Sequence, residues 1–224
     1  MPRPSLARRC LAEALATFAL VFAGCGAIIV DTERGGSLGA VGIAASFGLV
    51  IMAMIYATGH LSGAHINPAV TIAFSSLRHF PARDALSYVP AQLAGAIAAA
   101  LLLRLVWPGE PAQLGATHPG EGIGTAAAFG YEIVLTAILM FVIMAVATDT
   151  RAVGAAAAIA IGGTVALDSL FGGGVTGASM NPARSLGPAL AASSWGDIWI
   201  YIAGPLVGAV GGAFLYQLVR DEPA

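Results

Sequence analysis

The chain of 224 residues is 58% apolar, and only 10% of its residues are charged. Because soluble domains usually carry about 25% charged residues, this composition argues against a soluble protein. The formal net charge is −2 and the sequence has no basic patch or stripe, so nothing indicates a nucleic-acid partner.

Six stretches are long and apolar enough to cross a membrane, since a transmembrane helix needs about 20 mostly apolar residues. In chain order they are residues 9–30, 39–59, 83–107, 125–147, 152–172 and 197–219. The first stretch follows Arg8 and Arg9 in the manner of a signal peptide. Glu13 interrupts it and five further spans follow, so we interpret it as a retained helix, and we expect the protein to lie in membrane lipid.

The basic residues, all of them arginine, predict the orientation of these spans. If the N-terminus lies inside the cell, seven arginines are cytoplasmic and two, Arg34 and Arg104, are at the outer side. The cytoplasmic ones are Arg3, Arg8, Arg9, Arg78, Arg83, Arg151 and Arg220. Positive residues favour cytoplasmic loops, so we expect both termini in the cytoplasm.

Two further apolar segments, about 67–78 and 181–192, are too short to span. Each begins with Asn-Pro, and proline is favourable in the first turn of a helix because its missing N–H would be unpaired there. Each segment therefore predicts a short helix that follows a loop rich in small residues. The matching triplets are Asn67, Pro68 and Ala69 in the first segment and Asn181, Pro182 and Ala183 in the second.

The two halves of the chain are similar. SGAHINPAVTIA at 62–73 aligns with TGASMNPARSLG at 176–187, and AEALATFALVF at 12–22 resembles YEIVLTAILMF at 131–141. We expect one channel domain with a first repeat at about 7–107 and a second at about 125–219. Three spans per repeat is an odd number, so the copies must insert with opposite topology, and interrupted helices in inverted repeats indicate a site near the membrane midplane.

Such half-helices would bring their N-termini together and point the positive ends of their dipoles into a pore. Asn67 and Asn181 would add amide donors there. Loop carbonyls would accept hydrogen bonds from a passing water or hydroxyl compound, whereas protons and cations would meet a positive potential. This pattern predicts a passive channel for water and small uncharged solutes.

At these residues the chain resembles the major intrinsic proteins, the family of aquaporins and glycerol facilitators. GHLSGAHINPAVTIAF and TGASMNPARSLGPAL carry the resemblance, which extends from about Glu13 to Tyr216. It implies an all-α aquaporin-like fold, with six transmembrane helices plus two re-entrant half-helices in an inverted 3+3 repeat, and a homotetramer. TGASMNPARSLGPAL, MFVIMAVATDTRAVG and Tyr201-Ile202 look most like the plant nodulin-like branch, which passes glycerol, urea, ammonia and metalloid acids such as boric and arsenious acid. The short tails look like those of a bacterial relative in the inner membrane.

The resemblance also places the family's selectivity filter at Phe47, Ser169, Ala178 and Arg184. Water-selective bacterial members have His and Thr where this chain has the smaller Ser169 and Ala178, so we expect a wider opening. Ser185 departs from the Asp that is typical of glycerol facilitators. Arg184 lies inside the membrane, where a charge is expensive and usually functional.

Glu13 and Glu132 are expected to accept hydrogen bonds from the two pore loops, as the family's repeat-related glutamates do. His65 is expected to offer backbone or side-chain groups to the pore, and His60 to line the cytoplasmic mouth. Asp168 stands where the nodulin-like pattern has Asn, and it could rim the outer vestibule or pair with a neighbouring group.

Two other functions compete with the channel. A secondary transporter coupled to ions or protons also has inverted repeats and broken helices, but Glu13 and Glu132 are its only candidate coupling groups. An intramembrane enzyme would need a nucleophile elbow or a base–nucleophile pair, and neither is visible. No metal-ligand spacing is present, so we expect no metal and no cofactor. The sequence leaves the physiological solute and any gating open.

Overall fold

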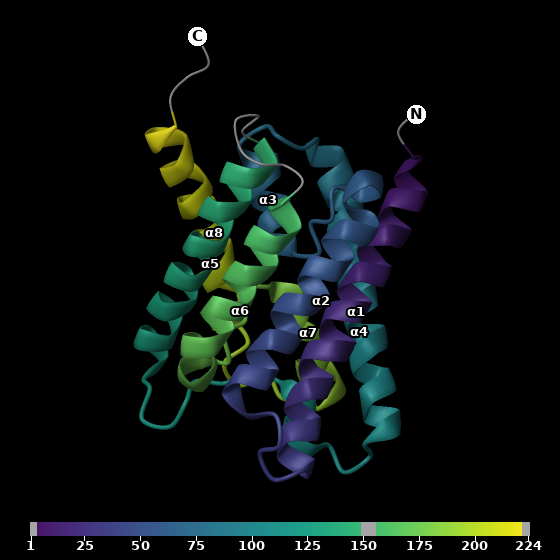
Figure 1. Cartoon of the computed structure of the whole chain (residues 1–224), viewed down its shortest axis with the longest axis vertical. Coiled ribbons are helices and arrows are strands. Elements are labelled where there is room, and N and C mark those ends of the chain that lie inside the picture. The colour runs from purple at the N-terminus through teal and green to yellow at the C-terminus, as the bar shows by residue number, and fades with distance from the viewer. Residues whose placement is uncertain (1–3, 149–155, 221–224) are drawn as a thin grey trace.

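The computed structural model describes residues 4–148 and 156–220. Within them the chain forms α1 (Leu6–Glu33), α2 (Gly39–Ser62), α3 (Pro68–Ser76), α4 (Ala82–Val106), the 3-10 turn η1 (Pro111–Gly115), α5 (Thr125–Thr148), α6 (Ala157–Thr176), α7 (Pro182–Ala191) and α8 (Ile200–Val219). Six of these described helices are long and apolar enough to cross a membrane. They run side by side, and the chain enters and leaves the bundle at the same end (Figure 1).

These helices confirm the six expected spans, with shifted ends. α2 and α6 continue three and four residues beyond the expected ends at 59 and 172. Each stops only where a glycine, Gly63 or Gly177, takes the left-handed conformation that ends a helix. The expected start of the fifth span at 152, Arg3 and Arg151 lie outside the described residues.

The short helices α3 and α7 begin where the Asn-Pro steps predict. Asn67 caps α3 because its side-chain oxygen accepts from Ala69 N at 2.8 Å. Asn181 caps α7 in the same way, accepting from Ala183 N at 3.0 Å. The proline that follows each asparagine occupies the first helical turn. Both half-helices therefore start from a side-chain cap inside the bundle.

Glycines allow the long helices to approach closely. Gly48 of α2 and Gly162 of α6 face each other, and a Cβ on Gly162 would lie 2.6 Å from the carbonyl oxygen of Gly48. Gly95 of α4 rests on the Ala14 carbonyl of α1. Small residues at helix contacts are the usual means of close packing in lipid.

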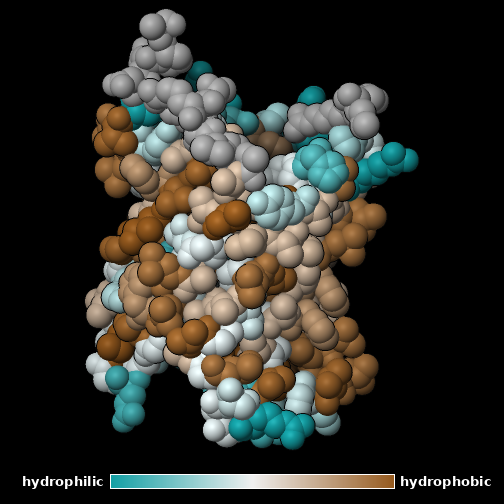
Figure 2. Space-filling model, viewed as in Figure 1, coloured by the Kyte–Doolittle hydropathy of each residue, from teal (hydrophilic) through white to brown (hydrophobic). Residues whose placement is uncertain are grey.

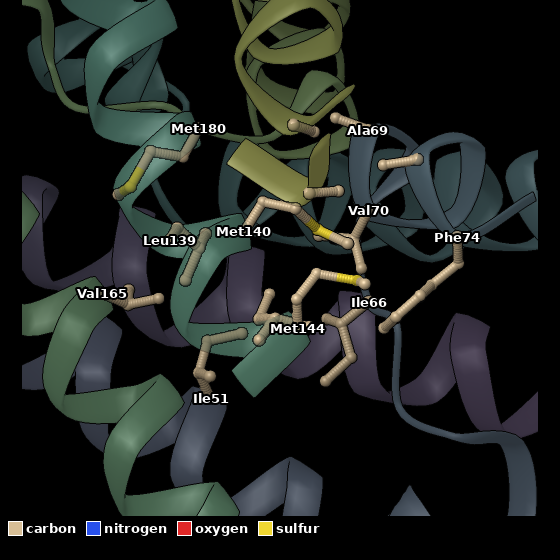
Figure 3. Packing of buried hydrophobic residues seen from close by; sticks show 14 of the residues in the cluster. Ile51, Ile66, Ala69, Val70, Phe74, Leu139, Met140, Met144, Val165 and Met180 are labelled. Atoms are coloured by element: carbon tan, nitrogen blue, oxygen red, sulfur yellow. The ribbon is translucent and has the colours of Figure 1, made fainter. Parts of the chain in front are cut away.

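The described outer surface is mainly apolar, and hydrophilic residues gather at the two ends of the bundle (Figure 2). Leu86, Leu105 and Val41 are among its exposed side chains. The buried core lies against α3, where Val70 and Phe74 pack with Met140 and Met144 of α5 (Figure 3). An apolar exterior on helices of this length indicates that the chain crosses a membrane several times.

Candidate functional site

The two half-helices meet inside the bundle through a reciprocal pair of hydrogen bonds. Asn67 Nδ2 donates to the carbonyl oxygen of Met180 at 2.7 Å, and Asn181 Nδ2 donates to that of Ile66 at 2.9 Å. Each asparagine therefore caps its own helix with its oxygen and holds the opposite loop with its nitrogen. This contact joins segments more than 100 residues apart and brings two positive helix ends together.

A cavity passes both asparagines, and a second cavity lies beyond it towards η1. The inner cavity has aliphatic walls from the long helices, such as Leu20 and Ile51, and polar groups from the two loops. The outer cavity is lined by α1, α2, α6 and the segment that contains η1. The helices give this path apolar walls and the loops give it polar groups. Water or a hydroxyl compound can therefore replace its hydrogen bonds to bulk water by hydrogen bonds to the loops.

Three of the four expected filter residues separate these cavities. Phe47, Ser169 and Arg184 line both, whereas Ala178 lines the inner one alone. The Arg184 guanidinium carbon lies 5.0 Å from the centre of the Phe47 ring, a distance typical of a cation–π contact. The structure thus brings one aromatic ring, one cation and two small residues together where the two cavities adjoin.

Arg184 is only 2% exposed and is held by the backbone. Its Nη1 donates to the carbonyl oxygen of Gly115 at 2.7 Å. Sequence reasoning missed Gly115, which lies on η1 in the loop between α4 and α5. Only the density of proline and glycine in that loop marks it as irregular, and this signal does not say that one carbonyl reaches Arg184.

The loop between α4 and α5 is also joined, through hydroxyl groups, to the loop that precedes α7, which we call the second pore loop. Thr117 Oγ1 donates to Ser185 Oγ at 2.8 Å, and Ser185 Oγ lies 2.6 Å from Ser179 Oγ. All three residues are buried. Ser185, where glycerol facilitators typically have Asp, therefore joins two loops rather than facing either cavity.

Glu13 holds the first pore loop from α1. Its Oε1 accepts from Ser62 Oγ at 2.7 Å and from His65 N at 2.9 Å, and its Oε2 accepts from Ile66 N at 2.7 Å and Gln92 Nε2 at 2.8 Å. Four donors surround one buried carboxylate. Such a group is expensive to leave unpaired, so it fixes the loop backbone strongly.

Glu132 holds the second pore loop from α5 in nearly the same way. It accepts from Thr176 Oγ1 at 2.7 Å and from the backbone nitrogens of Ser179 and Met180, both at 2.9 Å. Both glutamates therefore have protein partners of the expected kind. A transporter would need its coupling carboxylates available to an ion, and these two are engaged.

His65 lines the inner cavity. Its Nδ1 lies 3.1 Å from Thr71 Oγ1. Its ring is surrounded by Phe80, Phe74 and Tyr88, with ring centres 4.6, 5.1 and 5.3 Å away. By contrast, His60 is exposed at the end of α2 and lines neither cavity described above.

Asp168 does not rim the outer cavity. It is fully buried, it lines neither of the two cavities, and neither carboxylate oxygen has a hydrogen-bond partner among the described residues. Neither alternative from the sequence, the rim or a paired group, is found at Asp168. Proximity to Ser169 in sequence could not reveal this, because adjacent helical residues point in different directions.

The sequence profile of the family described as major intrinsic protein matches residues 1–216. Aquaporin NIP1-4 of Oryza sativa is 53% identical over 210 residues, covering 94% of this chain and 76% of the relative. Nodulin-26 of Glycine max is 49% identical over 219 residues, covering 96% and 80%. Among solved structures, the aquaglyceroporin of Plasmodium falciparum has a TM-score of 0.88 at 29% identity, covering 96% of this chain and 97% of that one.

Proposed function

The chain belongs to the major intrinsic protein family and is a passive membrane channel for water and small uncharged solutes, and we propose that Phe47, Ser169, Ala178 and Arg184 form its selectivity filter. One observation carries the proposal: Phe47, Ser169 and Arg184 line both cavities, so whatever passes between the cavities passes them. Arg184 can donate hydrogen bonds to a solute oxygen, and its charge repels cations.

The paired asparagines form a second barrier in this proposal. Asn67 and Asn181 stand at two helix N-termini whose dipoles point positive charge at the pore. A water molecule there can accept from an asparagine, whereas a proton or cation meets the same positive field. Both triplets are intact, so they do not distinguish one neutral solute from another.

The solute range follows from the side chains opposite Arg184. Ser169 and Ala178 are small, which leaves a wider opening than a strict water filter. We therefore propose that glycerol, urea and metalloid acids such as boric and arsenious acid pass together with water. Similarity to Nodulin-26 and to an aquaglyceroporin supports this range.

The assembly and cellular setting are proposed from the family resemblance and the distribution of charge. We propose a homotetramer in the lipid of the inner (plasma) membrane, with both termini in the cytoplasm. Within each subunit, residues 7–107 and 125–219 form the two repeats of one channel domain. Glu13 and Glu132 support the corresponding pore loops of these repeats, and His65 offers its ring to the inner cavity.

Stopped-flow light scattering on proteoliposomes tests the function. Vesicles that contain the protein should shrink faster than empty vesicles after an osmotic step, and they should then reswell as glycerol, urea or boric acid enters. Shrinkage at the rate of empty vesicles would contradict the channel. Fast shrinkage without faster solute entry would contradict the wide filter only.

A further inference from the structure

A buried ion pair lies at the end of the bundle that carries both termini. Arg9, in the first turn of α1, donates from Nη2 to Asp84 Oδ2 in the first turn of α4 at 3.0 Å. Their side chains are only 8% and 7% exposed. A buried pair gains little over apolar packing because both charges lose water. Stability alone therefore does not account for this ion pair.

Contacts lead from this pair to the inner cavity through Tyr88. Arg9 Nη1 lies 3.5 Å from Tyr88 Oη, and Tyr88 Oη donates to the Ser62 carbonyl oxygen at 2.8 Å. Ser62 ends α2 and also donates its hydroxyl to Glu13. The Tyr88 ring forms one side of the aromatic cage around His65, which lines the inner cavity.

The described residues of the second half contain no corresponding ion pair. Glu132 holds its pore loop nearly as Glu13 does, and we call each of these contacts a glutamate clamp. However, Ala128 stands four residues before Glu132, where Arg9 stands four residues before Glu13. Tyr201 corresponds to Tyr88 by its spacing to a helix contact. Tyr88 stands seven residues before Gly95, which packs on the residue that follows Glu13. Tyr201 stands seven residues before Gly208, which packs on the residue that follows Glu132. These equal spacings establish which residues correspond in the two halves.

The hydroxyl of Tyr201 has no hydrogen-bond partner among the described residues, whereas that of Tyr88 bonds both Arg9 and Ser62. In an inverted repeat, contacts that the fold requires should occur in both halves, as the glutamate clamps do. The Arg9–Asp84 pair occurs in one half only. Its role is therefore local to the pore mouth at that end.

We propose that the Arg9–Asp84 pair positions Tyr88 and, through Tyr88, keeps the His65 ring seated at the wall of the pore. The proposal rests on the channel function and deepens it. If the pair is broken, Tyr88 loses its guanidinium partner and the cage around His65 opens on one side. The imidazole can then turn from Thr71 into the lumen, which obstructs larger solutes more than water.

The first test compares Arg9→Gln and Asp84→Asn with the charge swap Arg9→Asp plus Asp84→Arg. Arg8→Gln is the matched control, because Arg8 is the adjacent exposed arginine. In proteoliposomes of equal protein content, the ratio of glycerol to water permeability should fall about two- to tenfold in the single variants. It should recover in the swap and stay unchanged in the control.

Thermal unfolding in detergent is measured on the same variants. Single variants that unfold at a lower temperature but keep the wild-type permeability ratio would overturn the proposal and leave the pair a structural role. If wild-type vesicles themselves shrink no faster than empty ones, the channel function fails instead, so the two failures are distinguishable.

A second pair of variants keeps the test decisive if the ionic variants do not fold. Tyr88→Phe retains the aromatic wall and removes the hydrogen bonds to Arg9 and Ser62, whereas Tyr201→Phe removes the corresponding hydroxyl from the other half. The permeability ratio should fall in Tyr88→Phe and remain at the wild-type value in Tyr201→Phe. Equal ratios in the two variants would overturn the proposal.

Discussion

Replacing Gly24 by alanine should push the Phe47 ring towards the pore and narrow the proposed filter. Gly24 lies on α1 against the Phe47 ring, and a Cβ there would lie 2.5 Å from both Cδ1 and Cζ of that ring and nearer still to Cε1. Carbon atoms in contact need about 3.5–4.0 Å, so the ring must move by about 1 Å or more. The ring lines both cavities, so movement away from α1 brings it towards the lumen and Arg184.

The displacement should affect glycerol more than water, because the wider solute needs the space that is lost. If the barrier for glycerol rises by about 1.4 kcal/mol, its flux falls about tenfold. Overpacking should also cost about 1–3 kcal/mol of stability. Stopped-flow measurement of water and glycerol permeability on the same proteoliposomes gives the ratio directly.

Gly26→Ala is the control on the same helix as Gly24, since a Cβ at Gly26 would lie 3.7 Å from Leu103 Cδ2 of α4, which is an ordinary contact distance. It should leave both permeabilities unchanged. If Gly24→Ala and Gly26→Ala give the same ratio of glycerol to water permeability, the assignment of Phe47 as a wall of the filter is refuted. The unfolding temperature of each variant is measured alongside, and only a Gly24→Ala protein that is folded in the vesicles counts in this comparison, because misfolding would lower both fluxes equally.

Replacing Ser169 by His together with Ala178 by Thr should narrow the filter and reduce glycerol and metalloid flux more than water flux in the same vesicle assay; equal losses would show that these positions do not set the size. Arg184→Val removes the fixed cation and should admit cations or larger solutes, measured as ionic current in planar bilayers and as solute entry into vesicles. Unchanged selectivity would remove the role proposed for Arg184. Asp168→Asn should keep wild-type water permeability and unfold at the same or a higher temperature, because a buried carboxylate without a partner is costly and a neutral amide is less so. Loss of flux in this variant would show that the carboxylate itself is needed.

Much of the bundle could be predicted because its signals are local or repeated. Apolar length predicts the spans, and the Asn-Pro steps predict the starts of α3 and α7, since capping depends on a few adjacent residues. The glutamate clamps were predictable from resemblance: their donors include the residues next to the asparagines, Ile66 and Met180. The end of α6 was harder to predict, because glycines at 172–174 suit helix packing as well as helix termination.

The residues that we propose as the filter could be named from the sequence, but the residues that support them could not. Gly115 lies 69 residues before Arg184, and Gly24 lies 23 residues before Phe47, so no periodicity connects either pair. Their contacts depend on how the loop between α4 and α5 folds over the bundle and on how closely α1 packs. The same holds for Asp168, whose burial depends on helix rotation.

The sequence by itself determined that this protein is a doubled, membrane-spanning channel, because span length, Asn-Pro caps and the internal repeat are encoded in short segments. Only the tertiary structure decided which carbonyl holds Arg184, that Asp168 is buried away from both cavities, and that an ion pair in the first half reaches His65 through Tyr88. Those features join residues that are distant in the chain, and their geometry exists only once the helices have packed.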